Sequence, residues 1–63
     1  MNRAEAIKID AKGFFFTEKS EAFEDLTGVY GSESGFCYGV FGSPEVAKRH
    51  ADRLNQDAPG IAA

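Results

Sequence analysis

The sequence predicts an α+β fold. It has a small antiparallel sheet of three to four strands joined by hairpins, one amphipathic C-terminal helix packed on one face, and a short helical turn in the middle. Three patterns lead to this prediction: apolar and polar residues alternate near the N-terminus, a turn-forming cluster separates two aromatic segments, and a helix start precedes a 3.6-residue period. With 63 residues, the chain is expected to form one small domain, residues 1–63.

The N-terminal segment, residues 6–17, is predicted to be extended. Ile7 and Ile9 alternate with Lys8 and Asp10, as the two faces of a half-buried strand require. The sequence DAKG at 10–13 then fits a type I turn followed by a left-handed glycine, which predicts a hairpin. One long bulged strand is the alternative.

Two further segments occupy the middle of the chain. Residues 20–28 begin with a serine cap, carry acids in the first turn and end in glycine, which predicts a short helical turn. Residues 31–35 read GSESG and separate Val29 and Tyr30 from the aromatic segment 36–41. Glycine and serine clusters of this kind favour turns, so a second hairpin is expected here.

Ser43, Pro44 and Glu45 predict the start of the C-terminal helix. Serine caps free backbone donors, the fixed φ of proline suits the first helical position, and the acid meets the positive end of the helix dipole. The helix is expected to run to about Gln56, and residues 57–63 to form a loose tail. Its packing face is predicted to comprise Val46, Ala47, His50, Ala51 and Leu54.

Composition limits the classes of function. Ten acids against seven bases give a net charge of −3, which opposes the phosphate attraction on which nucleic-acid binding depends. The single cysteine cannot form an internal disulfide, so a reducing cytoplasm is the expected compartment. Residues 1–12 are too charged for a signal-peptide core, and no apolar run approaches the roughly 20 residues of a membrane span.

Few residues suggest covalent or metal chemistry. Cys37 and His50 are the only thiol and imidazole, so they form the only candidate Cys-His nucleophilic pair. Both are expected to be structural, with Cys37 in mid-strand and His50 on the packing face of the helix. The pair falls short of the four ligands of a structural zinc site. We therefore expect no enzyme activity, no cofactor and no metal.

The aromatic segment 36–41 carries apolar residues on both faces of a strand. One helix can cover only one face of a sheet, and an exposed aromatic face commonly marks an interface. If Cys37, Gly39 and Phe41 lie under the helix, the residues left facing outward are Phe36, Tyr38 and Val40. The sequence therefore predicts a protein partner or a homodimer, unless segment 20–28 folds over the second face.

Acidic residues gather in the middle of the chain: Glu18, Glu21, Glu24, Asp25 and Glu33. They could offer carboxylates to a basic partner surface. The predicted partner-binding residues are accordingly Glu21, Glu24 and Asp25, together with Phe36, Tyr38 and Val40.

The segment Ser34 to Phe41, SGFCYGVF, resembles the signature octapeptide of RNA-recognition motifs. Gly35, Phe36, Tyr38 and Phe41 match that pattern. The resemblance implies that Phe36 and Tyr38 stack on bases and that Phe41 faces the helix. Binding of RNA or single-stranded nucleic acid is therefore the alternative expectation.

Non-enzymatic protein binding is the function that the sequence favours. In size and acidity the chain resembles the small inhibitors of phages and mobile elements, anti-CRISPR proteins among them. That resemblance implies an inhibitor acting on a host protein that handles nucleic acid.

Overall fold

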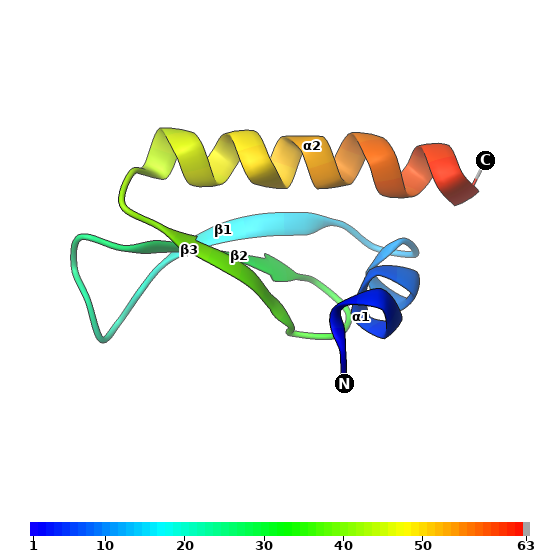
Figure 1. The fold of residues 1–63 in the computed structure, drawn as a ribbon, viewed down its shortest axis with the longest axis horizontal. Helices are drawn as coiled ribbons and strands as arrows, with labels where there is room; N and C mark the ends of the chain where they lie inside the picture. Colours follow the sequence, from blue (N-terminus) through cyan, green and yellow to red (C-terminus); the bar gives the residue numbers. More distant parts are fainter. Residues whose placement is uncertain (63) are drawn as a thin grey trace.

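The fold is a three-stranded sheet with one helix at each end of the chain. A computed structural model describes the backbone of residues 1–62 and the side chains of residues 1–57. The elements, in order, are α1 (Arg3–Asp10), β1 (Phe15–Lys19), β2 (Thr27–Gly31), β3 (Cys37–Phe41) and α2 (Pro44–Ala62). The strands form one antiparallel sheet in the order β1-β2-β3, and α2 lies along one face of it (Figure 1). The α+β class is therefore confirmed, but the fourth strand is not found among the described residues.

The first element is a helix, so the prediction of a strand there is wrong. The side chain of Asn2 caps α1 by accepting a hydrogen bond from the backbone N–H of Glu5 at 2.9 Å. Apolar and polar residues alternate over only four positions here, which is weak evidence for a strand. The Asn2 cap and the burial of Ala6 favour the helix instead. A turn does form at residues 10–13, where the N–H of Gly13 donates to the carbonyl of Asp10 at 2.9 Å. This turn joins α1 to β1 instead of joining two strands.

The predicted helical turn in the middle is also wrong. Residues 20–26 form the loop between β1 and β2, which extends beyond the end of the sheet opposite α1 (Figure 1). The Ser20 hydroxyl does accept a hydrogen bond from the N–H of Phe23, at 3.2 Å. The N–H of Ser20 then bonds the carbonyl of Leu26 at 2.9 Å, which closes a hairpin loop before a helix can propagate.

The hairpin between β2 and β3 is confirmed. Gly35 has a φ of 73°, which glycine adopts without strain, and its N–H bonds the carbonyl of Gly31 at 3.0 Å. The pairing then shifts: Val29 lies opposite Gly39, but Tyr30 lies opposite Cys37. One extra residue of β3 is therefore inserted at this point, as in a β-bulge.

The C-terminal helix starts at the predicted residue but continues further. The Ser43 hydroxyl donates to the Glu45 carboxylate at 2.6 Å, so the predicted capping of a backbone N–H by this side chain is wrong. The carbonyl of Ser43 accepts the first helical hydrogen bond from Ala47 at 3.0 Å, and Pro44 opens α2. The helix continues past Gln56 to Ala62, so the predicted end is wrong, and residue 63 lies outside the described residues.

The core lies between α2 and the middle strand. Val29, Ala47 and Ala51 are buried, and three half-buried residues pack around them: Tyr38, Phe41 and Leu54. The small alanine side chains let the helix approach the sheet closely.

One side chain of α2 also binds the edge of the sheet. The Asn55 side chain accepts the N–H of Phe15 at 2.7 Å and donates to its carbonyl at 2.9 Å. The backbone N–H and carbonyl of Phe14 both bond to Ser32, directly after β2. Since these groups point to alternate sides along a strand, those of the next residue, Phe15, point away from β2. Asn55 therefore fixes α2 over the β1 side of the sheet.

Candidate functional site

Both helices contact the same face of the sheet. Val29 points toward α2, where it meets Ala47 and Ala51. Asp10 at the end of α1 lies against Gly31, two residues further along β2 and thus on the same face. The opposite face of the sheet carries neither described helix. We call it the open face.

A row of aromatic rings crosses the open face. Phe16 lies opposite Tyr30 in the register of β1 and β2, with ring centroids 6.0 Å apart. Phe14, just before β1, lies 6.1 Å from Phe16. Phe14 is 58% exposed and Phe16 and Tyr30 are half-buried, so the row is open to solvent most at Phe14.

The third strand extends this apolar surface. Val40 lies opposite Gly28 and is 48% exposed, and the exposed thiol of Cys37 lies opposite Tyr30. The ring of Tyr30 lies over Gly28, in the space where a Cβ would stand. Burial, with the neighbouring Cys37 and Glu18, raises the pKa of Tyr30, so its hydroxyl is neutral at pH 7.

The charges near the open face are acidic. Glu18 follows Phe16 by two residues and is the only charged strand residue that shares its face. The predicted binding residues Glu21, Glu24 and Asp25 are all exposed in the β1–β2 loop. Two of these, Glu24 and Asp25, join Glu18 in lining a shallow cleft of about 620 Å³ at that end.

Glu33 is separate from this group. It lies in the β2–β3 turn, at the opposite end of the sheet, where its N–H donates to Asp10 at 2.9 Å. The structure therefore divides the acidic set that the sequence suggested.

The predicted outward-facing residues of β3 do not share one face. Val40 faces outward, as expected, and Phe41 packs toward α2. Tyr38 faces inward, and its ring packs edge-on against Phe15 with centroids 5.2 Å apart. Cys37 is exposed rather than covered. The bulge explains both errors, because it places Tyr38 and Gly39 together opposite Val29.

Phe36 is half-buried and packs edge-on against Tyr38, with centroids 4.9 Å apart. The two rings that the RNA-recognition resemblance assigns to base stacking are thus packed against each other. Whether either residue contacts a partner stays a prediction.

Asp10 accepts several hydrogen bonds on the helix-covered face of the sheet. Its carboxylate is fully buried and accepts four hydrogen bonds, from the N–H groups of Glu33 and Ser34 at 2.9 and 2.8 Å, and from the hydroxyls of Ser34 and Tyr38, each at 2.5 Å. Burial raises the pKa of Asp10, but these four donors together outweigh it and hold the pKa below 3.8. Burial, and then the hydrogen bond to Asp10, raise the pKa of the Tyr38 hydroxyl to about 12. This cluster holds α1 to the β2–β3 turn.

Cys37 and His50 do not form a catalytic pair. Cys37 lies on the open face, whereas the His50 ring stacks on Phe41 on the helix side, with centroids 4.2 Å apart. Within the described residues, no three histidine, cysteine or acidic side chains come together as metal ligands would. Neither helix, over its described length, is both long and apolar enough to cross a membrane.

Comparison with protein-family models, with curated proteins and with solved structures found no match. The function proposed below therefore rests on the geometry of the chain.

Sequence reasoning missed the aromatic row, although a signal was present. Phe14 and Phe16 are spaced by two, which places them on one face of a strand, and Tyr30 lies in the next strand. What the sequence lacked was the register that brings Phe16 opposite Tyr30. Asp10 carried no comparable signal, because its partners lie 23 to 28 residues away.

Proposed function

We propose that this protein is a non-enzymatic protein-binding module that uses the open face. The observation that carries the proposal is the uncovered aromatic row of Phe14, Phe16 and Tyr30, continued by Val40. Soluble monomers rarely expose contiguous apolar surface of this kind, and such surfaces commonly become buried in an interface.

The charges around the open face favour a basic partner. Glu18 lies on the face, and the acidic loop with Glu21, Glu24 and Asp25 extends beyond one end of it. A partner that presents an apolar patch beside lysine or arginine would match both features, and opposite charges speed association. Proteins that handle nucleic acid carry such basic surfaces, so we propose an inhibitor of this class of protein, as a small phage or mobile-element inhibitor would be.

Affinity capture from a host lysate tests the proposal when it is done with matched variants. Phe14→Gln and Val40→Gln change exposed residues and should leave the fold intact. Ile9→Gln is the control, since Ile9 is an exposed apolar residue on α1. We expect one dominant basic protein to be recovered by the wild type and by Ile9→Gln, and lost with the two open-face variants.

Two other occupants would give different results. If the open face binds a second copy of the chain, sedimentation will show a dimer that Val40→Gln dissociates. If it binds single-stranded nucleic acid, labelled oligonucleotides will bind with an affinity that falls steeply between 50 and 200 mM salt. Equal capture by all variants, or none by any, would overturn the proposal.

A further inference from the structure

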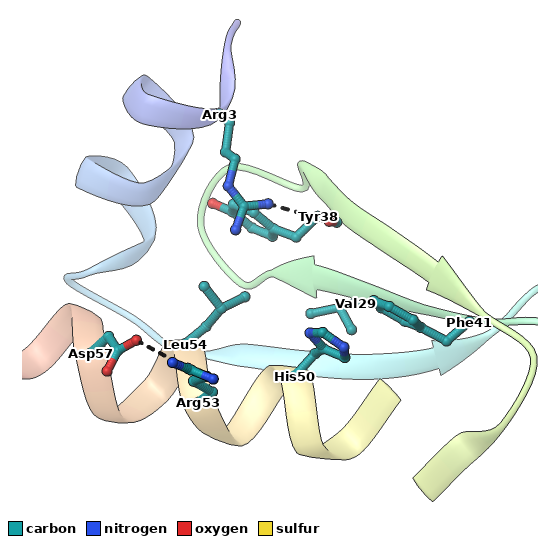
Figure 2. Close-up of a pocket in the computed structure, with 8 residues that line it drawn as sticks. All are labelled: Arg3, Val29, Tyr38, Phe41, His50, Arg53, Leu54 and Asp57. Atoms are coloured by element: carbon teal, nitrogen blue, oxygen red, sulfur yellow. Dashed lines mark hydrogen bonds and ion pairs between the residues drawn. The ribbon is translucent and has the colours of Figure 1, made fainter. Parts of the chain in front are cut away.

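A groove on the helix side of the sheet is separate from the open face. It has a volume of about 410 Å³ and is lined by residues of α1, β2, β3 and α2: Arg3, Val29, Tyr38, Phe41, His50, Arg53, Leu54 and Asp57 (Figure 2). Pockets that bind small molecules have volumes of about 300–1,000 Å³, so the size is suitable for a ligand of one or two rings.

The groove exists because α2 is displaced toward one edge of the sheet. Asn55 holds α2 over β1, while the buried Asp10 holds α1 near the β2–β3 turn. The space between the two helices is left above the sheet, where Val29, Tyr38 and Phe41 form its floor and Leu54 of α2 lines its side. This floor is largely apolar and aromatic.

Arg3 forms one side of the groove. Its guanidinium lies 5.5 Å from the centroid of the Tyr38 ring and donates one hydrogen bond to the Tyr38 carbonyl at 3.4 Å. A guanidinium has five N–H donors in a planar fork, so four remain for a ligand. The contact with Tyr38 orients this fork along the wall of the groove.

Arg53 and His50 project from α2 on the other side (Figure 2). Arg53 is paired with Asp57 only through its Nε, at 3.9 Å, and both side chains are well exposed. An exposed pair at that distance contributes little, so the terminal nitrogens of Arg53 are available to another anion. The His50 ring stacks flat on Phe41.

The local charge is opposite to that of the whole chain. The chain carries −3, yet two arginines, Arg3 and Arg53, line this groove against a single acid, Asp57. An anionic ligand would therefore be attracted to this groove rather than to the acidic open face.

We propose that this groove binds a small organic anion, namely a carboxylate carried on a flat apolar body. The carboxylate would lie between Arg3 and Arg53, where forked donors match its two oxygens, and the body would pack on Tyr38, Phe41 and Leu54. This site is independent of the proposed function, because the open face lies on the other side of the sheet.

The test uses 2-naphthoate as the probe and its neutral amide, 2-naphthamide, as the matched ligand control. Titration of ¹⁵N-labelled protein, followed by amide and arginine Nε shifts, should show binding with a Kd of about 1 mM, as expected for a ligand of this size. The shifts should centre on Arg3, Phe41 and Arg53. The amide should bind at least about fivefold more weakly, since it lacks the charge.

Protein variants separate the site from general charge effects. Arg3→Gln and Arg53→Gln should each weaken naphthoate binding by about fivefold. Lys48→Gln is the control, because it removes the same charge from an exposed position of α2 that does not line this groove, and binding should change by less than about twofold. Equal affinity for acid and amide, shifts centred on Phe14 and Tyr30, or no shift at several millimolar would each overturn the proposal.

Discussion

Replacing Asp10 with alanine should remove most of the free energy of unfolding of this domain. The carboxylate accepts four hydrogen bonds, so its loss leaves two turn N–H groups and two hydroxyls without their partner. A buried donor without an acceptor costs about 1–3 kcal/mol. If water satisfies the two hydroxyls, the remaining N–H groups of Glu33 and Ser34 together cost about 2–6 kcal/mol. A domain of this size is stable by only about 3–5 kcal/mol.

Urea denaturation provides the measurement. The chain has no tryptophan, so far-UV circular dichroism and tyrosine fluorescence are the suitable probes. With a slope of about 1 kcal/mol per molar urea, the midpoint should fall by at least about 2 M. Lys8→Ala is the matched control, because it removes an exposed charged side chain from the same helix and should shift stability by less than about 0.5 kcal/mol. An Asp10→Ala protein as stable as Lys8→Ala would refute the assignment of Asp10 as the group that joins α1 to the hairpin.

Three further predictions follow from the same contacts. Gly31→Ala should destabilise by about 2–4 kcal/mol, because its Cβ would occupy the position of the Asp10 carboxylate; in an Asp10→Ala background the same change should cost far less, and simple additivity in urea titrations would contradict this. The melting temperature should fall at both extremes of pH. The lowered pKa of Asp10 gives stability that is present above about pH 3.8 and lost as the pH falls further. The raised pKa of Tyr38 gives stability that is lost between pH 10 and about 12. If Asp10→Asn lost stability at low pH as the wild type does, Asp10 would be excluded as the cause of the acid effect. Asn55→Ala should cost about 1–2 kcal/mol and speed hydrogen exchange at the Phe15 amide, while Gln56→Ala, its exposed neighbour, should do neither.

The parts of the fold that the sequence predicted are those encoded by neighbouring residues. Ser43 and Pro44 favour a helix start before an amphipathic segment, and Gly35 adopts the positive φ of its turn through its own lack of a side chain. These features act over three or four residues, so their outcome could be derived directly.

The errors arose where distant contacts decide. Ile7 and Ile9 fit a strand, but Asn2 caps a helix there and Asp10 anchors it to a turn more than twenty residues away. In β3, one extra residue opposite Val29 turned Tyr38 from the predicted outer face to the inner one and left Cys37 exposed. Neither the register nor the bulge is visible in a single sequence.

Asn55 has a consequence for how this protein meets other chains. A primary amide offers the same donor and acceptor as a peptide group, so Asn55 supplies, for one residue, the neighbour that a fourth strand would have supplied to Phe15. An incoming strand cannot pair along the whole length of β1, because Asn55 already occupies the backbone N–H and carbonyl of its first residue, Phe15. Only Thr17 and Lys19 keep outward backbone groups, and a lysine at an edge discourages such pairing. The helix thus protects this edge from strand-to-strand aggregation while leaving the aromatic face accessible.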